Sequence, residues 1–258
     1  MVVITGGSEG IGRAFARYYA KRGHDLLLIA RQLEPLEILA KELVATYSVR
    51  VEILAQDVTA PDAPAAIDAA LAAAGAHCDL LINNAGIGLS GAFHDLPWDA
   101  VEGLLATNVT ASTRLMQHVL VGMRERGRGG IINLSSLGAY APGPYQSAYY
   151  ASRSYLLSLS EAVAAEVARD GVRITAVAPG PVRTRFHMKM GSERDLYRWL
   201  IPPISSRTVA RWAAVAHKLG VRVVVPGLFN NVLALSLRLM PHRISIQVQR
   251  ILFYPRNR

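Results

Sequence analysis

The sequence predicts an α/β fold in which one doubly wound, parallel, seven-stranded sheet forms the core of a single domain. Short apolar runs alternate with longer amphipathic stretches, and successive parallel strands need crossover helices between them. The chain has 258 residues, of which 51% are hydrophobic and 18% charged, which is enough to bury one large core. We expect that domain to span 1–228 and a basic extension to follow over 229–258.

The periodicity of apolar residues places the individual elements. Short apolar runs predict seven strands, at 2–4, 25–30, 50–54, 79–82, 130–134, 172–178 and 222–225. Longer stretches with apolar residues three and four positions apart predict helices, at 11–22, 33–47, 62–73, 98–126, 148–170 and 206–219. The regular alternation of the two classes is what favours a parallel sheet.

The first strand runs directly into a glycine-rich turn and then a helix. Glycines there permit a tight turn and let backbone N–H groups approach a pyrophosphate, which the N-terminus of the following helix also attracts. With a second strand completing the unit at 25–30, this arrangement predicts a dinucleotide site. Its candidate residues are Gly6, Ser8, Glu9, Gly10, Ile11 and Gly12.

The second strand ends in Ala30-Arg31-Gln32, where a NAD-selective site carries an acidic residue for the ribose 2′-hydroxyl. Arg31 suits a 2′-phosphate instead, because its planar donors match phosphate oxygens. We therefore expect NADP(H) rather than NAD(H) as the cofactor. The alternative is a solvated arginine at the start of a helix.

The most informative residues for chemistry are Ser136, Tyr149 and Arg153, which are 13 and 4 positions apart. Ser136 follows the strand at 130–134, and open α/β sheets bind ligands at the carboxyl ends of their strands. Tyr149 and Arg153 share one face of the helix at 148–170. A phenol gives up its proton reluctantly at neutral pH unless a cation lies close to it. The trio therefore predicts a proton-donating tyrosine, and a solvated surface pair is the alternative.

In chain order these segments resemble the motifs of the short-chain dehydrogenase/reductase superfamily. The matching patterns are T-G-x-x-x-G-x-G from Thr5, N-N-A-G from Asn83, S-x12-Y-x-x-x-K from Ser136 and P-G-x-V-x-T from Pro179, over roughly residues 1 to 230. The resemblance implies a Rossmann fold with strand order 3-2-1-4-5-6-7. It also implies homodimers or homotetramers built through the helices at 98–126 and 148–170.

The resemblance implies a role for each matching residue. Tyr149 is expected to protonate a substrate carbonyl oxygen as hydride arrives from the nicotinamide, Ser136 to hold that oxygen, and Asn108 to anchor a water chain. Asp57 and Val58 are expected at the adenine, and Tyr149 and Arg153 beside the nicotinamide ribose. The remaining expected cofactor contacts are Asn84, Ala85, Gly86, Pro179, Gly180, Val182 and Thr184.

Arg153 departs from the family pattern, which has lysine at this position. Arginine supplies the charge but is essentially never deprotonated, so it cannot pass a proton along a relay. Two hypotheses follow: a working NADP(H)-dependent reductase, or a NADP(H)-binding sensor or scaffold with little or no turnover. We favour the enzyme because Asn108, Ser136 and Tyr149 are all present.

The segment at 185–206 follows Thr184, where the resemblance implies a mobile substrate lid. Methionines and aromatic residues in a lid suit a lipophilic ketone. The alternative is that these residues only pack the lid down. The apolar residues in question are Phe186, Met188, Met190, Tyr197, Trp199, Leu200 and Ile201.

The positive charge of the chain is concentrated in its last quarter. Of 28 basic and 19 acidic residues, ten of the basic and none of the acidic follow Asp195. Apolar faces edged by arginines suit a membrane surface. Packing on the body or on a second subunit, and guidance of an anionic substrate carrier, are the alternatives. The residues of those faces are Leu233, Leu237, Met240, Ile244, Val248 and Leu252.

Other features narrow the classes of protein. Cys78 is the only cysteine, so no intramolecular disulfide forms, and its place beside a strand predicts packing. The seven histidines show no metal-ligand spacing, and no recognition motif for nucleic acid is present. The first strand begins at Val2 and no apolar run is long enough to span a membrane. We expect a cytoplasmic protein, with peripheral contact at the inner membrane surface as a further hypothesis.

Overall fold

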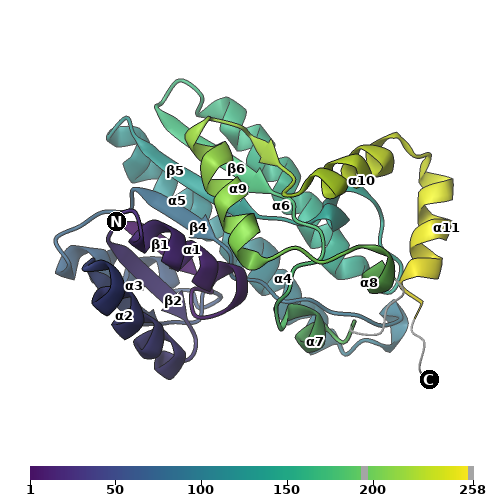
Figure 1. Ribbon diagram of the computed structural model, residues 1–258, viewed down its shortest axis with the longest axis horizontal. Coiled ribbons are helices and arrows are strands. Elements are labelled where there is room, and N and C mark those ends of the chain that lie inside the picture. The colour runs from purple at the N-terminus through teal and green to yellow at the C-terminus, as the bar shows by residue number, and fades with distance from the viewer. Residues whose placement is uncertain (193–196, 255–258) are drawn as a thin grey trace.

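The computed structural model describes residues 1–192 and 197–254, which form a seven-stranded parallel sheet with helices on both faces (Figure 1). The strand order is β3-β2-β1-β4-β5-β6-β7, as the family resemblance implied. The crossover from β3 back to β4 reverses the direction in which strands are added and creates a switch point beside β1. The strands are β1 (Val2–Thr5), β2 (Leu26–Ala30), β3 (Val51–Ala55), β4 (Leu80–Asn83), β5 (Gly129–Leu134), β6 (Val172–Val177) and β7 (Val223–Val224).

Alternate residues of each central strand enter two separate cores. Val2 and Ile4 of β1 pack into one core, and Val3 packs into the other, because side chains alternate across a strand. Helices cover both faces, which is why the strands are almost continuously apolar. On the first face lie α1 (Gly10–Ala20), α2 (Leu33–Tyr47) and α9 (Ser206–Lys218), and on the second α3 (Ala63–Ala73), α5 (Ser112–Glu125) and α6 (Ser147–Glu166).

The helix predicted at 98–126 is present as a continuous helical run over 98–125, but one turn inside it is π-helical. It consists of α4 (Trp98–Leu105), a π-helical turn η2 (Ala106–Ala111) and α5. The wider π turn carries the buried Asn108, and π turns of this kind are frequent at functional sites. Apolar periodicity cannot reveal such a turn because the apolar face continues through it.

Four short elements connect strand ends to the site. They are the 3₁₀ turns η1 (Phe93–Asp95) and η3 (Leu137–Tyr140), and the helices α7 (Phe186–Met190) and α8 (Tyr197–Leu200) within the predicted lid. After β7 the chain continues as α10 (Leu228–Leu239) and α11 (His242–Leu252), which stand at one side of the molecule (Figure 1). The described part of the basic extension is therefore mostly helical, over 228–239 and 242–252.

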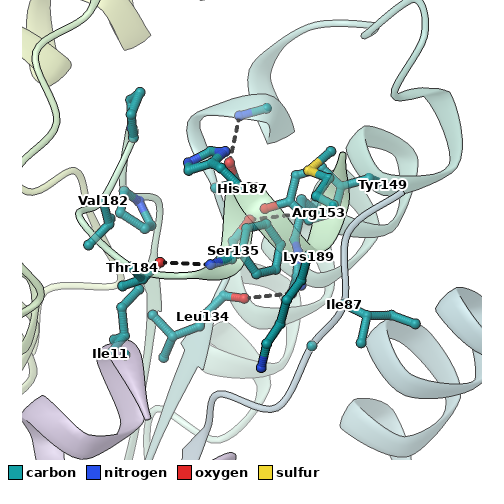
Figure 2. A pocket seen from close by; sticks show the side chains of 18 of the residues that line it. Ile11, Ile87, Leu134, Ser135, Tyr149, Arg153, Val182, Thr184, His187 and Lys189 are labelled. Carbon is teal, nitrogen blue, oxygen red and sulfur yellow. Dashed lines mark hydrogen bonds between the residues drawn. The ribbon is translucent and has the colours of Figure 1, made fainter. Parts of the chain in front are cut away.

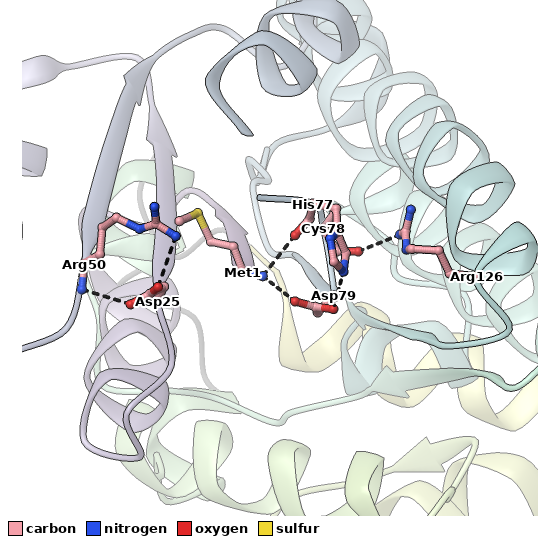
Figure 3. A network of polar contacts seen from close by, with 7 residues as sticks. All are labelled: Met1, Asp25, Arg50, His77, Cys78, Asp79 and Arg126. Carbon is pink, nitrogen blue, oxygen red and sulfur yellow. Dashed lines mark hydrogen bonds and ion pairs between the residues drawn. The ribbon is translucent and has the colours of Figure 1, made fainter. Parts of the chain in front are cut away.

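A network of polar contacts lies at the amino-terminal ends of the strands (Figure 3). Arg50 donates to the carboxylate of Asp25 from its backbone N–H at 3.0 Å and from its guanidinium at 3.2 Å. Arg126 donates to the carbonyl of Cys78 at 3.1 Å. The Cys78 thiol is buried, and that burial raises its pKa to about 12, so the thiol stays protonated and acts as a packing residue.

Within 1–192 and 197–254, no helix combines the length and hydropathy that crossing a bilayer requires.

Candidate functional site

A cavity of about 620 Å³ lies at the carboxyl ends of the strands, at the switch point beside β1 (Figure 2). Such a volume is within the usual range for ligand pockets. Eighteen of the residues expected from the sequence line it: Gly6, Ser8, Glu9, Gly10, Ile11, Arg31, Asp57, Val58, Asn84, Ala85, Gly86, Ser136, Tyr149, Arg153, Pro179, Gly180, Val182 and Thr184.

The glycine-rich turn between β1 and α1 has the backbone that only glycine adopts easily. Gly6 has φ +62° and Gly10 has φ +56°, both in the left-handed region. Gly12 does not line the cavity; a Cβ atom there would lie 2.1 Å from the carbonyl oxygen of Gly6. Gly12 therefore lets helix α1 pack against the turn, while Gly6 and Gly10 shape the wall that a phosphate would approach.

Thr5 and Asn84 join the carboxyl ends of β1 and β4. The Thr5 hydroxyl accepts hydrogen bonds from the backbone N–H groups of Asn84 and Ala85, each at 3.0 Å. The Asn84 side-chain amide donates to the carbonyl of Thr5 at 2.9 Å and to that of Gly6 at 3.1 Å. These bonds fix the glycine turn against the loop after β4, so the cleft between them is preformed.

Arg31 and Asp57 occupy one end of the cavity, after β2 and β3. Asp57 accepts hydrogen bonds from the backbone N–H and the hydroxyl of Thr59, at 2.9 and 2.8 Å. These bonds, and to a lesser degree the charge of Arg31, hold the pKa of the Asp57 carboxyl below its usual value. The Asp57 carboxylate is therefore ionised and bonded to its own loop, and Arg31 is the cation at this end.

Ser136, Tyr149 and Arg153 occupy the other end of the cavity. Ser136 directly follows β5, and its hydroxyl accepts a hydrogen bond from the Gly138 N–H at 3.1 Å as it caps η3. Tyr149 and Arg153 both project from α6, and the guanidinium carbon of Arg153 lies 5.0 Å from the centre of the Tyr149 ring. The structure thus brings the three residues predicted from spacing into one site.

Arg153 is 4% exposed and is held from two sides (Figure 2). Its Nη1 donates to the carbonyl of Leu134 at 2.9 Å, and its own carbonyl accepts from the Ser135 hydroxyl at 2.8 Å. Its Nε is buried without a hydrogen-bond partner, and within the described residues no carboxylate pairs with the guanidinium. A buried cation with spare donors at a cavity wall is suited to hold an oxygen-rich ligand.

Gly86 leaves room for the guanidinium of Arg153, which is larger than the ammonium group of a lysine. A Cβ atom at Gly86 would lie 2.3 Å from Nη2 of Arg153 and 3.2 Å from Oδ1 of Asn108. The glycine of the expected N-N-A-G segment therefore has a specific steric function in this chain, which is to leave space for the guanidinium.

Asn108 lies behind the cavity wall rather than on it. It is fully buried, and its amide exchanges hydrogen bonds with the backbone of Ile87, accepting at 2.9 Å and donating at 2.8 Å. It also donates to the Ser152 hydroxyl at 3.2 Å. In this arrangement Asn108 fixes the loop after β4 and links it to α6.

The predicted lid closes over the cavity through α7. Lys189 of α7 forms an ion pair with Glu9 of the glycine-rich turn, and Thr184 at the start of the lid packs on Gly10. Phe186 lies against Tyr149, with ring centres 5.6 Å apart. The lid thus contacts both ends of the site.

The lid residues predicted from the sequence divide into two groups. Phe186, Met190, Tyr197 and Ile201 line the cavity. Met188 and Leu200 are instead exposed, so their prediction as lining is wrong, because the short helices α7 and α8 turn those positions outward. The Trp199 side chain lies outside the described residues.

Helices α10 and α11 complete the cavity, a contribution that the sequence reasoning did not assign to the site. The face predicted from apolar spacing is turned inward at five of its six positions, and only Ile244 stays away from the cavity. The apolar spacing was the signal that could have found these residues, but spacing does not specify the partner surface. The lining residues are Leu233, Ser236, Leu237, Met240, Val248, Gln249, Leu252 and Phe253.

Phe253 joins the C-terminal segment to the predicted lid and to α6. Its ring centre lies 4.8 Å from that of Tyr197 and 5.4 Å from that of Tyr150, both edge to face. Phe253 is 3% exposed. One aromatic side chain therefore holds three separate segments around the cavity.

A nicotinamide dinucleotide fits the donors and the shape of this site. The glycine turn lets a pyrophosphate approach the backbone N–H groups at the start of α1, Arg31 lies at one end, and the incompletely satisfied Arg153 lies at the other. Among the described residues, no three His, Cys, Asp or Glu side chains gather in a way that would hold a metal ion.

Comparison with known proteins agrees with this geometry. A family model described as short chain dehydrogenase matches residues 1–195. The structure is similar to a short-chain dehydrogenase from Sphingobium yanoikuyae in complex with NADPH, with a TM-score of 0.80 and 34% sequence identity over 88% of this chain and 87% of the other.

Two curated relatives differ in their described activity. Human 17-beta-hydroxysteroid dehydrogenase type 3 is 36% identical over 185 residues, which are 70% of this chain and 59% of the relative. Human inactive hydroxysteroid dehydrogenase-like protein 1 is 30% identical over 234 residues, 82% of this chain and 68% of the relative. This chain thus spans less than two thirds of the first relative's length.

Proposed function

Because this chain belongs to the short-chain dehydrogenase family of oxidoreductases, we propose that it is an NADP(H)-dependent enzyme that interconverts a ketone and an alcohol on a lipophilic substrate. The observation that carries the proposal is the position of Tyr149. Its ring lies beside a buried cation and lines the same cavity as the glycine-rich turn.

In the reductive direction Tyr149 delivers the proton. The hydride for the carbonyl carbon would come from a reduced nicotinamide bound in the cleft. The Tyr149 hydroxyl transfers its proton to the carbonyl oxygen, and the Ser136 hydroxyl donates a hydrogen bond that holds this oxygen. One hydride and one proton convert the ketone to the alcohol and leave the phenolate, whose charge the Arg153 guanidinium stabilises. The reverse direction uses the same groups.

Arg153 acts through its charge and its donors, not as a proton carrier. Its guanidinium remains protonated throughout, so a proton cannot pass through it to Tyr149. The proton that restores Tyr149 must therefore arrive by another route, such as water entering the cavity. We infer that reprotonation is slower here than in an enzyme with lysine at this position.

The preference for NADP(H) rests on Arg31. This residue lines the cavity after β2, and no acidic residue occupies the end of that strand. Arginine binds a 2′-phosphate through charge and paired hydrogen bonds, whereas a carboxylate there would repel it. The NADPH complex of the Sphingobium relative supports the same choice.

The lipophilic substrate class rests on the apolar residues that line the cavity. Phe186, Met190 and Ile201 from the lid line one cavity together with Leu237 and Leu252 from the C-terminal helices. Apolar side chains from both segments favour a hydrophobic ketone over a small polar one. The relative that is a hydroxysteroid dehydrogenase supports this class.

A second candidate function is cofactor binding with little or no turnover. It is favoured by one specific observation, the arginine at position 153, and by a relative described as inactive. Such a protein would keep the cleft and the lid but would regenerate the Tyr149 proton too slowly to act as an enzyme.

The deciding experiment combines binding and turnover on one sample. We expect calorimetric titration to give tight NADPH binding and weaker NADH binding, and we expect NADPH oxidation to be fastest with bulky apolar ketones. Tyr149→Phe should lower turnover by about a hundredfold or more. The control is Tyr155→Phe, which removes an exposed hydroxyl on the same helix that contacts Thr113.

Three results would redirect the proposal. Tight NADPH binding without oxidation by any carbonyl compound would establish the binding function instead. A preference for short polar ketones would overturn the substrate class, and unchanged turnover of Tyr149→Phe would overturn the mechanism.

A further inference from the structure

Helix α10 carries two apolar faces on opposite sides. Leu233, Ala234 and Leu237 form the inner face, which packs on the body and lines the cavity. The outer face is a stripe with spacings of four, three and four residues, which aligns on one side of a helix. Its members are between 58% and 78% exposed, and they are Leu228, Val232, Leu235 and Leu239.

Helix α11 carries a similar exposed stripe. Ile244, Val248 and Ile251 are four and three residues apart and so lie on one side of the helix. Ile244 is 54% and Ile251 67% exposed, while Val248 also reaches the cavity. The second stripe therefore leads from the surface of the protein to the rim of the pocket.

The basic side chains of α11 flank its stripe. Arg243 and Arg250 are seven residues apart on the neighbouring side of the helix, and both are exposed. In the described part of the chain neither forms an ion pair with a carboxylate. No acidic residue follows Asp195 anywhere in the sequence, so nothing in this segment offsets their charge.

The two exposed apolar stripes and the flanking arginines together indicate what kind of partner docks on α10 and α11. Large apolar patches on a protein surface mark interaction sites. A second copy of this chain, docked through the same face, would bring two sets of arginines together without acidic partners, which is unfavourable. A bilayer containing anionic lipids satisfies both properties, because the apolar stripes enter the interface while the arginines meet lipid phosphates.

We propose that the outer stripes of α10 and α11, with Arg243 and Arg250, dock this protein onto the surface of a bilayer that contains anionic lipids. The helices then have two functions, since their inner faces roof the substrate cavity and their outer faces contact lipid. A lipophilic substrate dissolved in the bilayer would reach the cavity rim along the Val248 side of α11. The docking itself does not depend on catalysis.

The test is flotation of the full chain with vesicles of phosphatidylcholine alone or of phosphatidylcholine mixed with phosphatidylglycerol. We expect binding to the mixed vesicles at about 50 mM NaCl, and much weaker binding at about 500 mM. The double variant Arg243→Gln/Arg250→Gln should lower the bound fraction on mixed vesicles by about tenfold or more. Leu239→Glu/Ile251→Glu should lower it at least as far, because it places charge in both stripes.

The matched control is Ile38→Glu/Val44→Glu, which changes two exposed apolar residues of α2 on the opposite side of the molecule (Figure 1). It should bind mixed vesicles like the unmodified chain. Thermal unfolding of each variant, followed by circular dichroism, verifies that all compared proteins are folded.

Three outcomes would overturn the proposal. They are no flotation with mixed vesicles, equal loss of binding in the α2 control, and loss of a dimer rather than of vesicle binding in Leu239→Glu/Ile251→Glu as measured by light scattering. Because the readout is physical binding, absence of carbonyl reduction would leave this inference intact.

Discussion

Arg153 places its guanidinium carbon 5.0 Å from the centre of the Tyr149 ring, one helical turn farther along α6. The sequence spacing requires only that the two residues share a face. The close approach arises because Leu134 accepts a hydrogen bond from Nη1 and Gly86 leaves space for Nη2. The charge at the phenol therefore depends on two strand-end segments as well as on α6.

Replacing Arg153 with lysine should raise turnover. A lysine ammonium keeps the charge, fits in the same space and can exchange its protons, so it can take part in reprotonating Tyr149. Arg153→Met, which removes the charge, should lower turnover by about tenfold or more. Steady-state rates with NADPH and one ketone check both changes. Equal or lower turnover of Arg153→Lys would contradict this account of the site.

Alanine at Gly86 should damage the site through Arg153. Its Cβ would lie 2.3 Å from Nη2, so the guanidinium must move away from Tyr149. We expect Gly86→Ala to lower turnover clearly. The loss should be smaller in the Arg153→Lys background, because lysine has no Nη2 atom for the new Cβ to displace. Gly103→Ala in α4 is the control, since a Cβ there meets nothing within 4 Å. If Gly86→Ala lowers turnover equally in the two backgrounds, Gly86 does not act through Arg153.

Arg31→Ala should weaken NADPH binding by about tenfold or more and leave NADH binding nearly unchanged. The reason is that only NADPH carries the 2′-phosphate that arginine pairs with. Calorimetric titration with each cofactor measures the difference. Lys21→Ala, at the far end of α1, is a control for the loss of one exposed charge. If the binding of NADPH and NADH weakens equally, Arg31 does not bind the 2′-phosphate.

Phe253→Ala should loosen the packing of the C-terminal segment over the cavity. The ring lies between Tyr197 of the lid and Tyr150 of α6, and its removal leaves a buried void that commonly costs about 3–5 kcal/mol. We expect a higher KM for bulky ketones with little change in NADPH affinity, because the cofactor cleft lies elsewhere. Phe253→Leu keeps most of the volume and should largely restore KM. An unchanged KM for Phe253→Ala would show that the C-terminal segment at Phe253 does not shape the substrate site.

Stability should fall on acidification because of His217. Burial, with a smaller effect from Arg173, lowers the pKa of His217 to about 4 in the folded protein. The unfolded chain binds this proton near pH 6.5 and the folded chain does not, so unfolding is favoured as the pH falls from about 6.5 towards 4. The loss can reach about 3 kcal/mol. Urea unfolding across this range measures it.

The contacts of His217 explain why it stays neutral. The Thr175 hydroxyl donates to the carbonyl of Val221 at 2.8 Å, so it accepts from Nδ1 of His217 at 3.1 Å. Nε2 lies against Gly130, where a Cβ atom would be only 2.3 Å from it. His217→Gln should flatten the pH dependence, whereas His94→Gln at an exposed position should not. If His217→Gln leaves the slope of the unfolding free energy against pH unchanged, the pH dependence comes from groups other than His217.

Local patterns predicted much of the fold and of the site. Each strand and crossover helix has its own apolar periodicity, and the strand order followed from the family motifs. The glycine turn, Ser136 and Tyr149 were found because their chemistry requires certain residue types at fixed short spacings. The π turn at Asn108 was missed because it changes the backbone without changing the apolar pattern.

The sequence by itself determined the order of elements and the identity of the cleft, since those depend on residues close together in the chain. Only the tertiary structure decided that α10 and α11 return over the cavity, that Phe253 joins Tyr150 to Tyr197, and that Gly86 adjoins Arg153. These contacts join segments that are far apart in sequence. Their partners are selected by packing of the whole molecule, for which no local periodicity exists.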